Sequence, residues 1–425
     1  MKPRLCYTLL VYLLLPWALL HLLLRSRRQP EYRRHWGERF GFGASPGPGP
    51  WIWIHAVSVG ETRAAQPLVS ALRRQYPGHR ILLTHTTPTG RQTGIDLLGD
   101  TVSRRYLPYD TPGAMARFLD ACKPRFGILM ETELWPNLVA ACHDRGVPLM
   151  LANGRLSARS ARRYARASQL VAATLRGLVG IAAQTPADAQ RFHDLGAADV
   201  SVLGNLKFDI TPPAAQLELG AGFRRRIGPR PVLLCASTRE GEEDLILDAW
   251  QQYRDRGQAL LVIVPRHPQR FDEVAALVTA RGLRLQRRSD DADVDPATTI
   301  WLGDSLGEMF AYYVAGDVAF IGGSLLDYGC QNLIEACAVG RPVLVGPSTF
   351  NFAEAAANAI AAGAARQVPD ARELMGAMHA LLADEPARRA MGEAGSRFAA
   401  THRGATARTL AWLEERQGRG PDAAA

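Results

Sequence analysis

The chain lacks the cysteine patterns that build metal sites or disulfide frameworks. Its six cysteines stand at positions 6, 122, 142, 235, 330 and 337, with no CxxC pair and no other metal-ligand spacing. We therefore expect free thiols in a reducing compartment and no metal. Internal repeats and long low-complexity tracts are also lacking, which excludes a repeat protein. The biased stretches are a Gly/Pro-rich connector at 41–50 and a short tail after Gly418.

Most of the net positive charge lies at the N-terminus. The formal net charge is +9, but residues 1–40 hold eight Lys or Arg and two Glu, which gives +6 and leaves +3 for all the rest. Proteins that bind nucleic acid spread basic residues over the binding face. This distribution argues against a nucleic-acid partner and favours an anionic membrane surface.

One long uncharged apolar run stands at the N-terminus, from Leu5 to Leu24. Twenty helical residues at about 1.5 Å each span roughly 30 Å, the thickness of a bilayer core. Arginines at 25, 27 and 28 follow in place of a small-residue cleavage site, which indicates an uncleaved anchor with the body on the cytoplasmic side. A helix lying in the membrane interface is the alternative, because the run contains Thr8, Pro16 and His21.

The rest of the chain alternates apolar strand candidates with helical stretches twice over. We predict strands at 51–57, 80–86, 126–130, 148–152 and 178–182, and again at 232–236, 259–264, 299–302, 318–321 and 342–345. This alternation implies parallel, doubly wound sheets. A polar, proline-containing interval at 210–229 is interpreted as a linker. The predicted division is 1–40 for the anchor and basic segment, 41–212 for one α/β domain and 213–425 for a second, whose last helix, near 388–415, could return to the first.

The first motif joins a strand to a helix through small residues. The segment 51–54 is apolar and aromatic, His55-Ala56-Val57-Ser58-Val59-Gly60-Glu61 follows, and 62–76 places apolar residues on one helical face. Such a unit puts Glu61 at the carboxyl end of a strand, where open α/β sheets bind ligands. A carboxylate there can act as a base, or it can be a first-turn acid favoured by the helix dipole.

Two more motifs lie in the first half. Met130-Glu131-Thr132-Glu133-Leu134-Trp135-Pro136-Asn137 follows a strand, and Gly204-Asn205-Leu206-Lys207-Phe208-Asp209 ends the predicted domain. Glu131 and Glu133 point the same way on an extended chain, or one of them caps the next helix. A lone lysine such as Lys207 is usually a solvated surface residue.

The second half is suited to a nucleotide. In Val264-Pro265-Arg266-His267-Pro268, two cations follow a strand and can reach phosphate, although a surface turn has the same composition. Gly303-Asp304-Ser305-Leu306-Gly307-Glu308 opens a helix whose N–H groups can bind phosphate or a base edge, and Gly322-Gly323-Ser324 repeats this arrangement as a weaker signal. Asn332 and Glu335 share a helix face, where a carboxylate can accept hydrogen bonds from ribose hydroxyls.

In this order, the motifs at 55–61, 130–137, 204–209 and 264–268 closely resemble those of the bacterial Kdo transferases, which move 3-deoxy-D-manno-octulosonic acid (Kdo) from CMP-Kdo to the lipid A precursor. The resemblance runs from the hydrophobic segment to about residue 400. It implies an α/β GT-B fold, with two Rossmann-like domains facing a cleft, the first for the acceptor and the second for CMP-Kdo. It also implies an inverting, metal-independent glycosyltransferase of lipopolysaccharide core biosynthesis without a cofactor. The implied acceptor is the lipid A precursor (lipid IVA), and the implied location is the cytoplasmic face of the inner membrane.

The resemblance also assigns residue roles. Glu61 matches the proton acceptor, and Glu131 and Lys207 match transition-state stabilisers. The implied CMP-binding residues are Arg266, His267, Leu306, Gly307, Glu308, Asn332, Leu333, Ile334 and Glu335. This chain departs from the expected Gly-Gly-His-Asn pattern by having Gly329-Cys330-Gln331-Asn332. Gln331 can hydrogen-bond but cannot carry an imidazolium charge, so any contact that needs this charge is in doubt here.

Three other functions compete. A metal-dependent transferase is suggested by Asp-x-Asp at 291–293 and 293–295, but this run follows Arg287-Arg288-Ser289 and precedes Pro296, which is typical of a solvated loop. A nucleotide-sugar epimerase shares the two-domain fold but needs no membrane anchor. A non-catalytic membrane scaffold would not bind CMP. The number of Kdo units transferred does not follow from the sequence.

Overall fold

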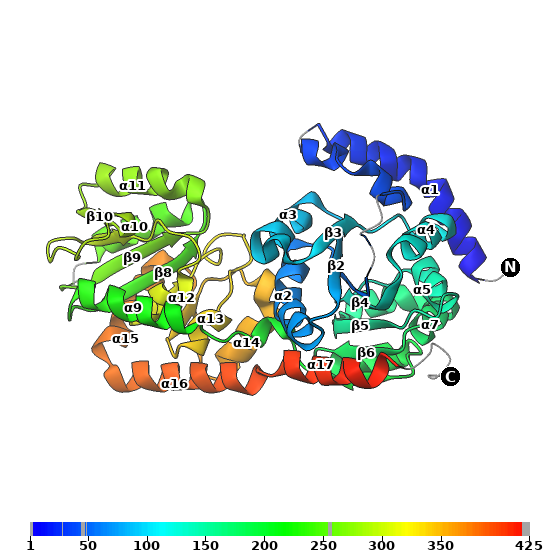
Figure 1. Cartoon of the computed structure of the whole chain (residues 1–425). Helices are drawn as coiled ribbons and strands as arrows, with labels where there is room; N and C mark the ends of the chain where they lie inside the picture. The colour runs from blue at the N-terminus through cyan, green and yellow to red at the C-terminus, as the bar shows by residue number, and fades with distance from the viewer. Residues whose placement is uncertain (1–2, 28, 44–46, 48, 254–256, 419–425) are drawn as a thin grey trace. The chain divides into compact units, whose positions relative to one another are not determined.

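The computed structural model describes residues 3–27, 29–43, 47, 49–253 and 257–418. Arg28, most of the connector at 44–48 and the tail from 419 were part of the sequence interpretation and lie outside the described residues. The chain divides into two compact units, Met1–Asp209 with Arg403–Ala425, and Ile210–His402. The strands of the described residues form one seven-stranded parallel sheet in each unit, which confirms the predicted pair of doubly wound domains (Figure 1).

The sheet of the first unit has the order β3-β2-β1-β4-β5-β6-β7. Its strand order reverses between β1 and β4, which lie side by side in the middle of the sheet. In such sheets ligands bind beyond the carboxyl ends of the strands at this point. The strands are β1 Trp51–His55, β2 Arg80–His85, β3 Ser103–Tyr106, β4 Pro124–Met130, β5 Leu149–Gly154, β6 Gly180–Ala183 and β7 Val200–Val202.

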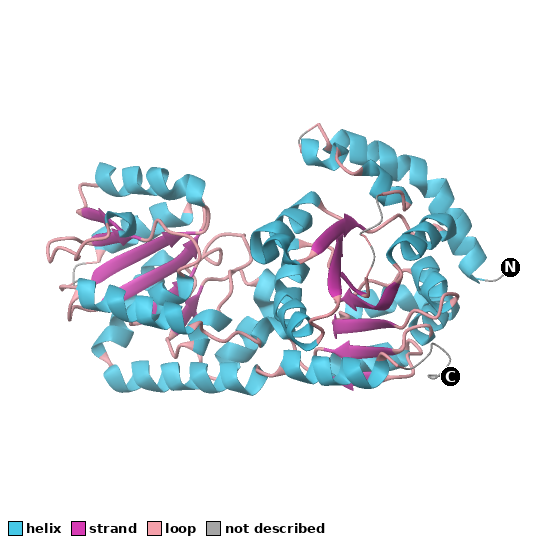
Figure 2. Cartoon of the chain, in the orientation of Figure 1, coloured by secondary structure: helices cyan, strands magenta, loops and turns pink. Residues whose placement is uncertain are grey.

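Helices cover both faces of this sheet (Figure 2). Successive side chains of a strand point to opposite faces. Trp51 and Trp53 therefore pack on one side, with α4, α5 and α7, whereas Ile52 and Ile54 pack on the other, with α2 and α17. The helices of this unit are α1 Pro3–Arg25, α2 Val59–Gln75, α3 Pro88–Leu98, α4 Pro112–Cys122, α5 Pro136–His143, α6 Ala158–Tyr164, α7 Ser168–Arg176, α8 Pro186–Asp194 and α17 Ala405–Arg416.

The C-terminal helix differs from its prediction. In place of one helix at 388–415, α16 (Glu385–His402) ends before Gly404, whose φ of 85° breaks the helix, and α17 then begins. The Asp209 carboxylate accepts the N–H groups of Gly404 and Thr406 at 2.8 and 2.5 Å. The described residues from Arg403 on therefore group with the first unit, whereas the sequence placed them in the second domain, 213–425.

Helix α1 lies along the first unit and packs against α5 and α7 (Figure 1). The Tyr7 hydroxyl donates to Asp110 at 2.9 Å, and the Thr8 hydroxyl donates to Asn137 at 2.9 Å. The opposite face is apolar and open, with Leu13 76% and Trp17 65% exposed. By length and composition α1 is long and apolar enough to cross a membrane.

The sheet of the second unit has the order β10-β11-β9-β8-β12-β13-β14 and reverses between β8 and β12. Its strands are β8 Val232–Thr238, β9 Leu260–Pro265, β10 Leu285–Arg287, β11 Ile300–Leu302, β12 Val318–Ile321, β13 Val343–Val345 and β14 Ala365–Gln367. Its helices are α9 Ala214–Ile227, α10 Glu242–Gln252, α11 Phe271–Ala280, α12 Met309–Ala315, α13 Ile334–Ala338, α14 Ala353–Ala361, α15 Ala371–Ala383 and α16.

The interval interpreted as a linker is a helix. Within 210–229, α9 buries Gly220, Phe223 and Ile227, which lie on one helical face, and the helix ends at Gly228. The Phe223 ring contacts Trp301 and Tyr312 with centroids 5.2 Å from each. The boundary between the units does fall at the start of this interval, after Asp209. Most of the interval is nevertheless a packed helix, because its few apolar residues carry the packing while the polar ones face water.

Candidate active site

Two carboxylates meet at the point where the first sheet reverses. Glu61 follows β1 in the first turn of α2, and Glu131 directly follows β4, the neighbouring strand. Both predicted residues therefore lie at the carboxyl edge of the sheet. Electrostatic coupling links the Glu61 carboxyl to Glu131 and Glu133, so three acids form one cluster.

Glu61 is fixed by the turn that precedes its helix. Ser58 is the N-cap of α2, and its hydroxyl accepts the Glu61 N–H at 3.4 Å. The Glu61 carboxylate accepts the Val57 N–H at 2.8 Å and the Ser58 hydroxyl at 3.0 Å. This reciprocal arrangement is a variant of the capping box. Each carboxylate oxygen keeps a further lone pair after these two bonds.

The environment of Glu61 raises its pKa toward neutral pH. Its side chain is buried, with only 9% of the residue exposed. Burial, followed by repulsion from Glu131 and Glu133, raises the pKa of Glu61 to about 7 against the hydrogen bonds from Val57 and Ser58. A general base works best when its pKa lies near the working pH. The helix-cap and base interpretations are therefore compatible in one side chain.

Glu131 and Lys207 form an ion pair. The Lys207 ammonium lies 3.1 Å from Glu131 Oε1, and both side chains are partly exposed. Glu131 has a φ of 60°, an unusual value for a residue with a side chain, and such strain is concentrated at functional sites. The structure thus brings together the three residues predicted to take part in catalysis.

An amide network fixes the short 3-10 helix Leu206–Phe208, which carries Lys207. Asn205 accepts the Lys207 N–H at 2.9 Å and donates to Gln184 at 2.9 Å. Gln184 in turn donates to the Asn153 carbonyl at 2.9 Å, and the Asn153 side chain accepts the Leu206 N–H at 3.0 Å. These amides hold the ammonium beside Glu131. Sequence reasoning missed Gln184 and Asn153 because neither stands in a motif with charge.

Glu133 is the third acid of the cluster. Its carboxylate accepts the Trp135 indole N–H at 2.8 Å, and Trp135 is the N-cap residue of α5. Burial and then repulsion from Glu131 raise the pKa of Glu133. The sequence left open whether Glu133 faces a site or caps a helix. Its carboxylate makes a side-chain hydrogen bond to the cap residue while it adds negative charge near Glu61.

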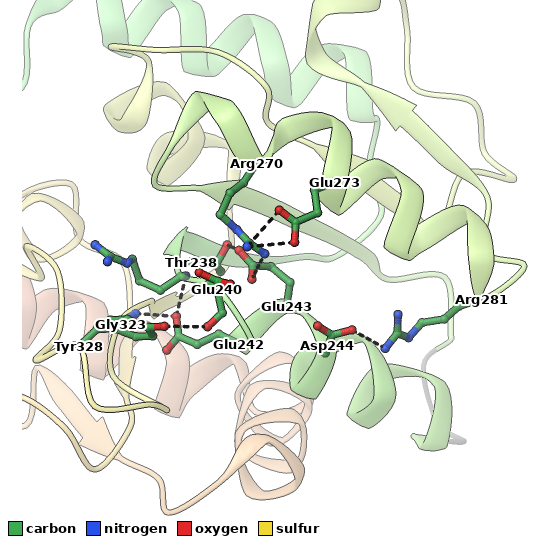
Figure 3. Close-up of polar contacts among 11 residues, drawn as sticks. Thr238, Glu240, Glu242, Glu243, Asp244, Arg270, Glu273, Arg281, Gly323 and Tyr328 are labelled. Atoms are coloured by element: carbon green, nitrogen blue, oxygen red, sulfur yellow. Dashed lines mark hydrogen bonds and ion pairs between the residues drawn. The ribbon is translucent and has the colours of Figure 1, made fainter. Parts of the chain in front are cut away.

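In the second unit, a buried carboxylate organises the reversal point between β8 and β12. Glu242, at the start of α10, accepts the N–H group of Gly323 at 2.6 Å (Figure 3). It also accepts the N–H groups of Arg239 and Leu325 at 2.8 and 2.9 Å. These bonds fix the Gly322-Gly323-Ser324 turn against the end of β8. The sequence analysis missed Glu242, although a glutamate that follows a strand and starts a helix was the same signal that identified Glu61.

Cations gather where β8 and β9 end. Arg266 and His267 follow β9, and desolvation, then the charges of Arg239, Arg266 and Arg270, lower the pKa of His267. Arg270 is held by the buried Glu243 at 3.0 Å and by Glu273 at 3.2 Å (Figure 3). A cluster of guanidinium groups at a strand end suits phosphate.

The remaining predicted donor residues fall into two groups. Asn332 donates to Glu335 at 3.0 Å at the start of α13, and Gln331 accepts from Arg266 at 3.3 Å, which links this loop to the cations. Leu333 and Ile334 are buried. Glu308, by contrast, accepts two hydrogen bonds from the Arg288 guanidinium, each at 3.1 Å. The two residues before it are Gly307, whose φ is 77°, and Leu306, which is exposed.

The Asp-rich loop is tied to arginines. Asp291 lies 2.5 Å from Arg226 and 3.3 Å from Arg288, and these contacts lower its pKa. No group of three or more His, Cys, Asp or Glu that could hold a metal ion occurs among the described residues. The six cysteines are free thiols; five are buried and Cys6 is exposed.

Comparisons with known proteins identify the family. Residues 34–210 match the family model of 3-deoxy-D-manno-octulosonic-acid transferase (kdotransferase). The 3-deoxy-D-manno-octulosonic acid transferase of Bordetella pertussis is 49% identical over 85% of this chain and 86% of its own length. That of Haemophilus influenzae is 37% identical over 97% and 98%.

Solved structures agree on the fold. A UDP-GlcNAc 2-epimerase from Neisseria meningitidis, bound to UDP-GlcNAc, matches with a TM-score of 0.57 at 15% identity, covering 86% of this chain and all of that one. This likeness shows shared architecture alone. With its two parallel Rossmann-like sheets and these relatives, the chain belongs to the 3-deoxy-D-manno-octulosonic acid transferase family and is a glycosyltransferase of the GT-B fold.

Proposed function

We propose that this protein transfers Kdo from CMP-Kdo to lipid IVA, with inversion at the anomeric carbon, in lipopolysaccharide core biosynthesis. The observation that carries the proposal is Glu61, a carboxyl with a pKa of about 7 beside the Glu131–Lys207 ion pair. The chain's relatives are Kdo transferases, and such transfer needs a base for the acceptor hydroxyl.

The roles of the first-unit residues follow from charge. Departure of CMP leaves an oxocarbenium-like centre, and the acceptor hydroxyl attacks it while Glu61 accepts the hydroxyl proton. Glu131 supplies negative charge near the cationic centre. Lys207 supplies positive charge for groups that become negative, and its pairing with Glu131 fixes its position. Such preorganised charges stabilise a transition state without reorganisation.

We assign donor binding to the second unit. Arg266 and His267 would contact the phosphate, with the neutral Gln331 amide holding the Arg266 guanidinium. Asn332 and Glu335 would bind the ribose hydroxyls. Because the side chains of Leu333 and Ile334 are buried, these residues would contact the nucleotide only through backbone groups. Leu306, Gly307 and Glu308, in the loop before α12, would contact it from another side of the site. Asp291 already pairs with two arginines, which argues against a metal at the first Asp-x-Asp pair.

The decisive experiment is mass spectrometry of the lipid formed from CMP-Kdo and lipid IVA. We expect a mass increase of one or more Kdo units, both with and without EDTA. The same spectrum counts the sugars added. Release of an isomerised nucleotide sugar with unmodified lipid would instead indicate an epimerase, and loss of product in EDTA with recovery on added Mg²⁺ would indicate a metal-dependent transferase.

Donor binding is tested at Glu335. Glu335→Ala removes the proposed ribose acceptor and should weaken inhibition by CMP by about 1.5–3 kcal/mol, or roughly tenfold or more. The measurement is the CMP inhibition constant. Glu373→Ala is the matched control, because Glu373 also stands in the first turn of a helix of the same unit, α15. Equal inhibition constants for Glu335→Ala and wild type would remove Glu335 from the donor site.

Membrane attachment is assigned to the outer face of α1, on the proposed cytoplasmic side of the inner membrane. Because Tyr7 and Thr8 bond to Asp110 and Asn137 of the unit's body, we infer that α1 lies in the lipid interface instead of crossing the bilayer. The exposed face lacks charge, and Arg25 and Arg27 follow it.

Charge on this face should release the protein. Leu13→Glu with Trp17→Glu replaces two exposed apolar side chains, each of which contributes about 1.5–3 kcal/mol when buried in lipid. We expect the affinity for phosphatidylglycerol vesicles, measured by co-sedimentation, to fall at least about tenfold. Kdo transfer to acceptor dispersed in detergent should stay normal. Leu217→Glu with Leu245→Glu, two exposed leucines of the second unit, is the control. Vesicle binding equal to that of wild type would exclude this face as the membrane contact.

A further inference from the structure

An uncompensated basic surface covers α6 and the turn after it. Residues 145–187 contain arginines at 145, 155, 159, 162, 163, 166 and 176 and no aspartate or glutamate. Five of these, here called the α6 arginine surface, are exposed: Arg155, Arg159, Arg162, Arg163 and Arg166. The rest of the body is close to neutral, so this concentration of one sign stands out from its composition.

The five guanidinium groups are not used by the fold. In the part of the chain that the structure describes, none of them makes an ion pair or a side-chain hydrogen bond. Neighbouring arginines behave differently: Arg145 pairs with Asp120 at 2.8 Å, and Arg191 pairs with Asp188 at 3.5 Å. Local repulsion among five unpaired cations costs stability, which an anionic ligand would offset.

The segment beneath these arginines is firmly anchored. Ala161 and Tyr164 pack against the core of the first unit, which turns the arginines of α6 outward. The Leu156 N–H donates to the buried Asp188 at 2.8 Å, and Ser157 caps the helix by accepting the Ser160 N–H at 3.1 Å. The α6 arginine surface is therefore presented on a fixed support.

The α6 arginine surface lies along the chain between the residues that contact the acidic cluster of Glu61, Glu131 and Glu133 and those that pack against α1. The Arg155 N–H donates to the Glu131 carbonyl at 3.4 Å, and the Thr132 hydroxyl donates to the Arg155 carbonyl at 2.5 Å. Burial, and then the charge of Glu133, raise the pKa of the Tyr164 hydroxyl, so the side chain of Tyr164 faces the acidic cluster. On the other side, α7 begins two residues after Arg166, at Ser168, and packs against α1.

We propose that the α6 arginine surface binds the phosphate groups of the lipid acceptor, a step that rests on the proposed function and adds a recognition site to it. The acceptor must reach Glu61 with its sugar hydroxyl while its acyl chains stay near the membrane. Along the chain, α6 lies between Arg155, whose backbone bonds to Glu131 and Thr132, and α7, which packs against α1. Arginine forks match phosphate oxygens in pairs.

The test is a triple variant, Arg159→Gln, Arg162→Gln and Arg163→Gln, assayed with lipid IVA in neutral detergent. We expect the KM for intact lipid IVA to rise at least about tenfold, with the KM for CMP-Kdo unchanged. Wild type should show a similar rise with enzymatically dephosphorylated lipid IVA, and the variant should not distinguish the two lipids. The control is Arg225→Gln, Arg366→Gln and Arg372→Gln, which removes the same charge from exposed positions of the second unit.

Three outcomes would overturn the proposal. The first is an unchanged KM of the triple variant for intact lipid IVA. The second is an equal rise of its KM for intact and for dephosphorylated lipid IVA. The third is weaker binding of the variant to phosphatidylglycerol vesicles together with a normal KM in detergent. The last outcome would assign the surface to bulk anionic phospholipid. If wild type transfers no Kdo at all, the proposed function fails separately. In that case, the affinities of wild type and variant for intact and dephosphorylated lipid IVA, each presented in neutral micelles, still decide whether these arginines recognise phosphate.

Discussion

Glu61→Gln is expected to slow Kdo transfer by at least about a hundredfold while CMP still binds. The glutamine keeps the shape of the side chain and can still accept the Val57 N–H, but it cannot accept the proton of the acceptor hydroxyl. Loss of a general base typically costs about 10²- to 10⁴-fold in rate. The measurement is kcat for lipid IVA at pH 8, alongside the CMP inhibition constant.

The pH dependence of the wild type should have an acidic limb set by the same residue. With its pKa raised to about 7 by burial and neighbouring acids, Glu61 is protonated and inactive as a base below that pH. We expect the rate to rise about tenfold per pH unit up to about 7 and then level off. In Glu61→Gln this limb should be absent.

The melting temperature distinguishes a catalytic role of Glu61 from a role as a helix cap alone. A carboxyl with a folded pKa above its ordinary value of 4.5 contributes stability below pH 4.5 that is lost as the pH rises through about 7. Glu61→Gln removes this loss and should melt no lower than wild type at pH 8. Ser58→Ala, the control, should cost about 0.5–2 kcal/mol of unfolding free energy and keep most activity. Near-normal turnover of Glu61→Gln with a lower melting temperature would leave Glu61 with a structural role alone.

Lys207→Met is expected to lower kcat by about 10²- to 10³-fold, the typical cost of removing one preorganised charge or donor from a transition state. Methionine keeps the length of the side chain and removes its charge. Lys123→Met provides a control for the loss of a lysine charge, because Lys123 is an exposed residue of the same unit. A Lys207→Met enzyme as fast as Lys123→Met would show that the ion pair is only structural.

The acidic limb offers a second measure of the same ion pair. Lys207→Met leaves the Glu131 charge unbalanced near Glu61, so the limb should move to higher pH. Glu131→Gln removes a charge that raises the pKa of Glu61, so the limb should move to lower pH. Shifts of opposite sign are expected from the cluster geometry, whereas general loss of folding would move neither limb.

Most of the architecture could be read from local patterns. The central strands were predictable because each is an apolar run buried on both faces, such as Trp51–His55 and Leu260–Pro265. The strands that were missed are β3, β7, β10 and β14, and these are the four sheet edges. Edge strands are short here and half solvated, so β10 and β14 contain charged or amide residues and give no apolar signal.

Motif positions were predictable for a related reason. In a parallel sheet the segment after each strand emerges at one edge, so Glu61, Glu131 and Arg266 had to lie at carboxyl ends once their strands were recognised. Glu242 also follows a strand and starts a helix, so its position was predictable too, but its partners, the N–H groups of Gly323 and Leu325, are visible only in the structure.

The sequence by itself determined the family, the two parallel sheets and the strand ends that carry the candidate residues, since these depend on periodicity and on the order of motifs along the chain. Tertiary structure alone decided which residues meet. Lys207 pairs with Glu131, and Arg266 bonds to Gln331, across separations that no local pattern encodes. The pKa of Glu61 was likewise beyond sequence reasoning, because it is set by burial and by charges that the fold brings from other strands.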